Sequence, residues 1–126
     1  MTLWKAENLI RVSLESLAWP ELVDLMTKTI GSELTACIAG LEDIRSLDAW
    51  IAGEKPLREV ENRVRFAYEI VCTLREGNAY GVVQSWLTEI NPELGDQVPL
   101  RLLRDGDLES IGPRILKAAS SFVVGG

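Results

Sequence analysis

Residues 56–77 read PLREVENRVRFAYEIVCTLREG, and this stretch decides the fold. Apolar side chains recur there at steps of three and four residues, at Val60, Val64, Ala67, Val71 and Leu74. That spacing places them on one face of an α-helix. Other apolar side chains cover the remaining faces of its second half: Phe66, Tyr68, Ile70 and Cys72. A helix that is apolar on all sides is buried on all sides. We therefore predict a helix from Pro56 to Glu76 whose residues 64–74 form the centre of the core.

The helical period continues on both sides of this stretch. It predicts further helices over residues 3–17, 20–30, 34–41, 45–52, 80–90 and 99–103. A last helix is expected to begin at Gly112-Pro113, with the proline in the first helical position, where its missing N–H costs nothing. Alternation with a period of two residues, bounded by turn signals, occurs nowhere. The sequence therefore predicts an all-α fold of about seven short helices.

The composition excludes most catalytic chemistry. The 126 residues contain no histidine, which removes the Ser-His-Asp and Cys-His nucleophile systems and the commonest general base near neutral pH. Cys37 and Cys72 are too few for an all-cysteine zinc site, and we interpret Cys37 as a packing residue on an apolar helix face. The acidic clusters alternate with Arg or Lys or lie in turns, which is typical of solvated helix ends. We predict no enzyme activity, no cofactor and no metal site.

Charge and hydropathy indicate the kind of partner and the cellular compartment. Thirteen basic and nineteen acidic residues give a net charge of −6, which suits a basic protein partner and weakens any claim on nucleic acid. No segment approaches the roughly eighteen consecutive apolar residues of a membrane helix. The charged residues within 1–17 interrupt what would have to be the apolar core of a signal peptide. We expect a reduced, cytoplasmic protein that does not enter a membrane.

Residues 34–53 have the spacing of a helix-turn-helix. Ala36 is small enough to let two helices cross closely, and Gly40 allows a sharp turn. Three apolar side chains are then expected to wedge the second helix against the first: Leu41, Leu47 and Trp50. The outward residues of that second helix would be Arg45, Ser46, Asp48 and Ala49.

If this unit binds duplex DNA, Arg45 and Ser46 are the residues that would approach a groove. The cations that would contact backbone phosphate are Lys55, Arg58 and Arg63. Glu42, Asp43 and Asp48 place negative charge on the same surface, which opposes DNA binding. The alternative is an acidic helical module that binds a protein and no DNA.

The last third of the chain carries a series of short motifs. Trp86-Leu87 is followed by Asn91-Pro92-Glu93-Leu94, then by Pro99-Leu100-Arg101-Leu102-Leu103, and then by Asp105-Gly106 before the last helix. This order resembles the toxin-binding domain of the Xre/MbcA/ParS antitoxins. The resemblance extends back through Arg65-Phe66-Ala67-Tyr68, which is similar to the helix that joins the family's helix-turn-helix to that domain. It covers roughly residues 32–123.

The resemblance implies two parts and a function. Residues 1–57 would be an N-terminal helical region with an Xre-like helix-turn-helix at about 32–53, packed on a small helical toxin-binding-like domain formed by residues 58–126. The family's members neutralise a RES-type toxin, an NAD-degrading enzyme, and repress their own operon. A protein of this family would therefore bind a RES-type toxin and duplex DNA, and would form a homodimer.

A protein partner would meet the surface around residues 91–106 and the C-terminal tail. The candidate contact residues are Asn91, Glu93, Arg101, Arg104, Phe122, Val123 and Val124. The turn at 91–95 and Pro99 predict a rigid loop beside Trp86, which would cost little entropy to dock. Residues 120–126 could equally be a frayed chain end or an apolar segment that docks on the partner.

Overall fold

The computed structural model describes residues 17–125, and in this range the chain folds into helices alone. Seven α-helices and one short 3₁₀-helix follow one another: α2 (Trp19–Ile30), α3 (Ser32–Ala39), α4 (Arg45–Ile51), α5 (Arg58–Arg75), α6 (Tyr80–Thr88), η1 (Pro92–Leu94), α7 (Pro99–Asp105) and α8 (Leu108–Gly125). The predicted all-α fold is confirmed for this part of the chain. The helix expected over residues 3–17 lies outside it, apart from its last residue.

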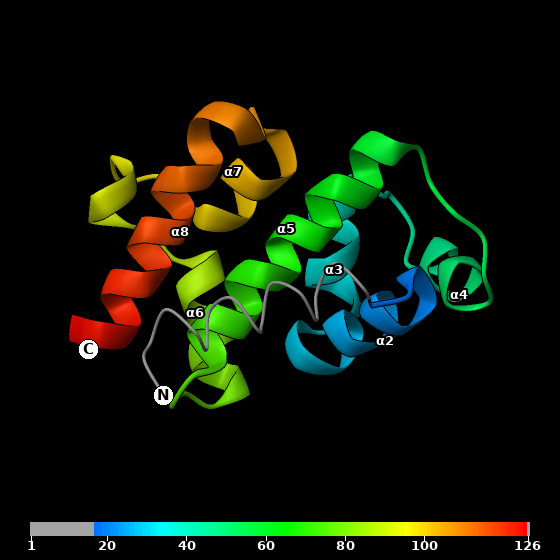
Figure 1. Ribbon diagram of the computed structural model, residues 1–126, viewed down its shortest axis with the longest axis horizontal. Helices are drawn as coiled ribbons and strands as arrows, with labels where there is room; N and C mark the ends of the chain where they lie inside the picture. Colours follow the sequence, from blue (N-terminus) through cyan, green and yellow to red (C-terminus); the bar gives the residue numbers. More distant parts are fainter. Residues whose placement is uncertain (1–16, 126) are drawn as a thin grey trace.

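Helix α5 is the central element. It runs diagonally through the molecule, with α2, α3 and α4 on one side and α6, α7 and α8 on the other (Figure 1). Its fully buried side chains occupy one face: Val64, Ala67, Ile70, Val71 and Leu74. Phe66, Tyr68 and Cys72 are only half-buried, so the prediction that residues 64–74 are buried all round is wrong. Burial in α5 therefore follows a face of the helix and does not surround it.

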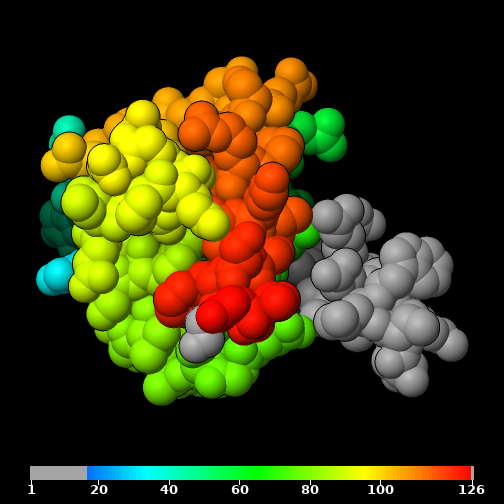
Figure 2. All heavy atoms as spheres, turned by 90° about the vertical axis from the view of Figure 1, so that its left-hand side faces the viewer, coloured from blue at the N-terminus to red at the C-terminus, as the bar shows by residue number. Residues whose placement is uncertain are grey.

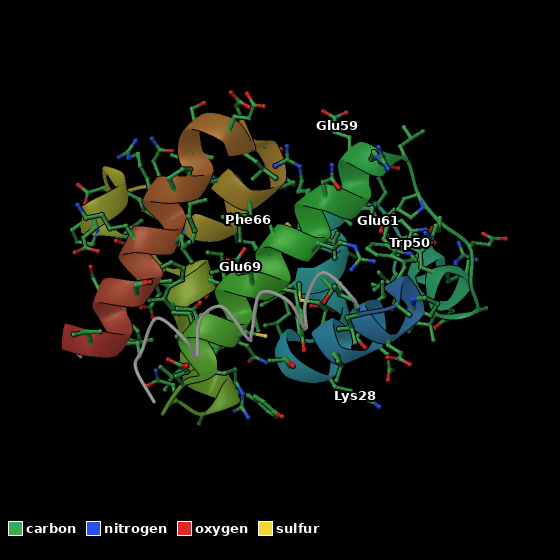
Figure 3. The ribbon with its side chains drawn as sticks, viewed as in Figure 1. Lys28, Trp50, Glu59, Glu61, Phe66 and Glu69 are labelled. Carbon is green, nitrogen blue, oxygen red and sulfur yellow. The ribbon has the colours of Figure 1, made fainter. Side chains whose placement is uncertain are left out.

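Trp50 anchors α4 to α2 (Figure 3). Its ring lies 5.4 Å from the ring of Trp19, centroid to centroid, and both rings are buried. Aromatic pairs at this separation add to the free energy of burial. The sequence predicted that Leu41, Leu47 and Trp50 wedge α4 against α3, but α4 packs mainly on α2. Gly40 does make the expected sharp turn, in a left-handed conformation with φ of 75°.

Helix α8 begins at Leu108 and not at the predicted Gly112-Pro113. Asp107 starts it: its carbonyl accepts the N–H of Ile111 at 2.8 Å, and its Oδ2 accepts the hydroxyl of Ser110 at 2.7 Å. Its Oδ1 also accepts the N–H of Glu109 at 3.4 Å, a group that has no partner inside the helix. Pro113 therefore lies within the helix, where it removes one backbone hydrogen bond on an exposed side.

Two glycines allow close packing around α8. A Cβ atom on Gly112 would lie 3.3 Å from the ring of Phe66, so α8 approaches α5 closely at this point. A Cβ atom on Gly106, in the turn between α7 and α8, would lie 2.6 Å from the carbonyl oxygen of Leu102. The absence of a side chain at these two glycines lets α8 pack this closely. The last turns of α8 form one wall of the candidate site. Between residues 17 and 125, none of the helices combines the length and apolar character needed to span a membrane.

Candidate partner-binding groove

A groove lies between the end of α6, η1 and the last turns of α8, and we call it the α6–α8 groove. Its volume is about 480 Å³, and its lining residues are Trp86, Glu89, Ile90, Asn91, Pro92, Glu93, Ala118, Ser121, Phe122 and Gly125. Figure 2 looks onto this face, where the yellow-green end of α6, the yellow η1 region and the red end of α8 meet. Residues some thirty positions apart in the sequence thus form one surface.

The loop that forms one wall is held by its own hydrogen bonds. The side-chain oxygen of Asn91 accepts the N–H of Glu93 at 2.9 Å, and the Asn91 carbonyl accepts the N–H of Asp96 at 2.9 Å. The Asn91 N–H donates to the carbonyl of Gln97 at 3.0 Å. Gly95 and Asp96 both adopt positive φ, 67° and 60°, which reverses the chain tightly. The turn predicted at residues 91–95 beside Trp86 is therefore present, and its own hydrogen bonds close it.

Aromatic rings connect the two walls. The ring of Phe122 in α8 lies 6.5 Å from the ring of Trp86 in α6, with 56° between their planes. Trp86 is buried, whereas Phe122 is half-buried and lines the groove. Residues 120–125 are helical, so the frayed end considered from the sequence is not what the structure has. Val124 on the last turn is 85% exposed, and Val123 is half-buried.

Charged side chains border the apolar part. Glu89 and Glu93 line the groove from the α6–η1 side, and both are exposed. A smaller hollow of about 300 Å³ continues past Glu93 along α8, where it is lined by Arg114, Lys117 and Ala118. Glu93 and Ala118 belong to both spaces, so the two are contiguous. Ile90, 66% exposed, adds an apolar side chain at the rim.

The structure groups some of the predicted partner-binding residues and separates others. Asn91, Glu93 and Phe122 line the groove together. Arg104 borders a different hollow, between α3 and α7, where its guanidinium lies 3.7 Å from Cys37 Sγ and forms an ion pair with Asp105 at 2.8 Å. Arg101 is exposed on α7 and lines neither space described along α8. Cys37 is only half-buried, although the sequence suggested a packing role.

Sequence reasoning did not single out Glu89, Ile90 and Ser121 as contact residues. Ile90 was assigned to the apolar face of the helix over 80–90, but α6 ends at Thr88 and leaves Ile90 outside it. The signal that could have found it is the Asn91-Pro92 pair, because the residue directly before a proline is pushed out of helical conformation and a helix usually ends at or before it. Nothing in the local pattern marks Ser121, which reaches the groove only because α8 packs beside η1.

The candidate DNA-binding residues occupy varied environments. Arg45 is exposed, but it forms an ion pair with Asp43 at 2.5 Å, and its backbone N–H donates to the same carboxylate at 2.8 Å. The hydrogen bond from Arg45 lowers the pKa of Asp43, so this pair carries no net charge at neutral pH. Ser46 is half-buried, and Lys55 and Arg58 are exposed.

Arg63, the fifth candidate for DNA contact, faces inward. Its guanidinium donates to the carbonyl oxygens of Leu103 and Gly106 at the end of α7, the second at 2.9 Å. A cation at this position satisfies carbonyl groups that have no partner within the helix. The contact therefore couples α5 to the α7–α8 turn, and it uses donors that the sequence assigned to phosphate.

Between residues 17 and 125, His, Cys, Asp and Glu side chains form no group of three that could hold a metal ion. Burial raises the pKa of the Cys72 thiol, and burial together with the neighbouring Cys72 raises the pKa of Tyr68 to about 12. Both groups are therefore protonated at neutral pH.

Searches of protein-family models, of curated proteins and of solved structures find no significant match for this chain.

Proposed function

We propose that this chain is a partner-binding protein of the antitoxin type and that the α6–α8 groove holds part of another protein. One observation carries the proposal: Asn91, Glu93 and Phe122, chosen from the sequence as partner contacts, line one groove together. The resemblance to the Xre/MbcA/ParS antitoxins points to a RES-type, NAD-degrading enzyme as the partner.

The groove has the physical properties of a protein-binding surface. Its aromatic pair offers a large apolar area, and the hydrogen-bonded loop 91–97 is already in place before binding. A surface that is ordered in advance loses little entropy when a partner docks. Ile90 and Val124 expose apolar area at its edge that a partner would cover.

The charges favour a protein that binds a protein partner and does not bind DNA. Arg45 is neutralised by Asp43, Arg63 is bound to α7, and Asp48 is exposed on the same short helix as Arg45. Binding to duplex DNA depends on cations that remain available to phosphate. Homodimer formation and a cytoplasmic location stay predictions from the resemblance and the composition, and autoregulation of an operon, which requires DNA binding, belongs to the DNA-binding alternative.

Co-expression with a RES-type enzyme tests the proposal. The enzyme alone should deplete cellular NAD and stop growth, and the wild-type chain should restore both. Ile90→Asp should abolish the rescue, because it places a charge in the apolar rim at a side chain that is 66% exposed and does not support the core. Leu57→Asp is the matched control, since Leu57 is 78% exposed before α5, away from the groove.

Rescue by the wild-type chain and by Leu57→Asp, with loss in Ile90→Asp, supports the proposal. Failure of the wild-type chain to restore NAD, or equal rescue by the two aspartate variants, contradicts it. Soluble expression and an unchanged thermal midpoint show that each variant is folded.

A further inference from the structure

The α6–α8 groove and its continuation along α8 carry an ordered arrangement of charge beside an apolar strip. From the C-terminal end of α8 backwards, the lining passes from Gly125 and Phe122 through Ala118 to Lys117 and Arg114. Over these residues the helix rises by about 17 Å, at roughly 1.5 Å per residue. That length is about three helical turns, so the surface can accept one short secondary-structure element.

The charged side chains along this surface are available to a partner. Between residues 17 and 125, Glu89, Glu93, Arg114 and Lys117 take part in no side-chain hydrogen bond or ion pair. The carboxylates belong to the α6–η1 wall and the two cations to the α8 wall, and Glu93 lines the same hollow as Arg114 and Lys117. A bound segment can therefore pair with both signs of charge without breaking an existing contact.

We propose that the occupant of this surface is an amphipathic helix of the partner protein. Its apolar face covers Phe122 and Ile90, a lysine or arginine lies against Glu89 and Glu93, and a carboxylate lies against Arg114 and Lys117. This inference rests on the proposed function and specifies the chemistry of the partner segment.

The walls favour a helix over an extended strand. An added strand needs an open sheet edge whose backbone groups pair with it, and the described part of the chain contains no strand. The walls of the groove are side chains of α6, η1 and α8, and a helix satisfies its own backbone groups. Apolar side chains at helical spacing then reach the aromatic strip in successive turns.

Opposite charge on the two walls sets the partner segment apart from a purely basic one. Complementary charges flanking an apolar contact chiefly determine which partner binds and in which direction.

Three labelled peptides of about fourteen residues, or four helical turns, provide the probe. All three carry the same leucine stripe. The bipolar peptide has lysines along one flank of the stripe and glutamates along the other, the acidic peptide has glutamates on both flanks, and the basic peptide has lysines on both flanks. Fluorescence anisotropy with the full-length chain measures their dissociation constants at low salt.

The bipolar peptide should bind at least about tenfold more tightly than the acidic peptide, a difference of roughly 1.4 kcal/mol. Glu89→Gln combined with Glu93→Gln should weaken it about tenfold, and so should Arg114→Gln combined with Lys117→Gln. The matched control is Glu59→Gln, a glutamate that points outward from the first turn of α5, far from α8 (Figure 3). It should leave the affinity unchanged.

A charge swap makes the test specific. Glu93→Lys should weaken the bipolar peptide and strengthen the acidic one. The inference is overturned if the three peptides bind equally, if the bipolar peptide fails to bind at about 1 mM, or if the Glu59→Gln control matters as much as the groove variants. It is also overturned if sedimentation shows a dimer that Ile90→Asp dissociates, since a second copy then occupies the surface.

The two proposals fail in different ways. If the RES-type enzyme is neutralised through Ile90 but the three peptides have equal dissociation constants, the proposed function stands and the inferred chemistry of the partner helix is wrong. If the bipolar peptide binds as described and the enzyme is not neutralised, the groove chemistry stands and the class of partner is wrong.

Discussion

The ring of Phe122 lies 6.5 Å from the ring of Trp86, and this contact ties the last turns of α8 to α6. Trp86 is buried, so Phe122 extends the core to the surface at the point where the groove opens. Side chains that shape the binding surface therefore also contribute to the stability of the fold. Experiments on the groove need variants that separate these two roles.

Phe122→Ala should lower the free energy of unfolding by about 1–2 kcal/mol, because it removes a half-buried ring and its contact with Trp86. Urea unfolding followed by tryptophan fluorescence measures the change. Val124 lies two residues after Phe122 and is 85% exposed. Val124→Ala should therefore change the free energy of unfolding by less than about 0.5 kcal/mol. Equal effects of the two substitutions would show that Phe122 does not pack as described.

Gly106→Ala should lower the free energy of unfolding by about 1–3 kcal/mol, since the new Cβ would meet backbone that cannot move aside. It would lie 2.6 Å from the Leu102 carbonyl oxygen and 2.9 Å from Ile111 Cγ2. The control is Gly81→Ala in α6, where a Cβ meets nothing within 4 Å. That substitution should raise stability by about 0.5–1 kcal/mol through better helix propensity. Thermal and urea unfolding of both variants check the contrast, and a neutral Gly106→Ala would contradict the tight turn.

The charges around α4 predict weak or absent duplex binding. In a gel-shift assay at about 50 mM salt, where phosphate contacts are strongest, the wild-type chain should leave duplex DNA unshifted. Asp43→Asn should increase any residual binding, because it releases Arg45 from its ion pair. A salt-sensitive shift by the wild-type chain that Arg45→Ala and Arg58→Ala remove would instead establish the DNA-binding form of the proposed function.

Alkaline pH should destabilise the protein through Tyr68 and Cys72. Folding raises the pKa of Tyr68 from 10.0 to about 12 and raises the pKa of Cys72 above 9.0, chiefly by burial. A group whose pKa is higher in the folded state stabilises it fully below the unfolded pKa and loses that contribution as the pH rises through the folded pKa. The free energy of unfolding should therefore be level near pH 7–8 and fall above about pH 9.

Urea unfolding at a series of pH values measures this decline. Tyr68→Phe should reduce its slope above about pH 10, since phenylalanine has no hydroxyl to ionise. Cys72→Ser should reduce the slope that begins near pH 9, for the same reason. A decline that neither substitution alters would show that other groups cause it.

Local sequence patterns determined the helices of this protein. Pro20 at the start of α2, Gly40 after α3 and Gly77 after α5 act through their own backbone preferences, so the observed bounds lie within a few residues of the predicted ones. The apolar stripe of α5 likewise identified its buried face, because helical spacing alone decides which side chains share a side. The start of α8 differs from the prediction because proline favours the first helical position, whereas here the carbonyl of Asp107 accepts the first helical hydrogen bond and Pro113 lies inside the helix.

Only the tertiary structure decided which helices meet. An apolar stripe shows that a helix face is covered but not by what, so α4 could be predicted on α3 and be found on α2. The sequence pattern indicated that Arg63 is a free cation, but in the structure its guanidinium donates to the carbonyl of Gly106 at the end of α7. The groove joins Asn91 and Phe122, whose separation along the chain leaves no periodic signal. Their proximity follows from how α6 and α8 pack around α5, because contacts between distant residues depend on the complementary shapes of whole helices and not on local preference.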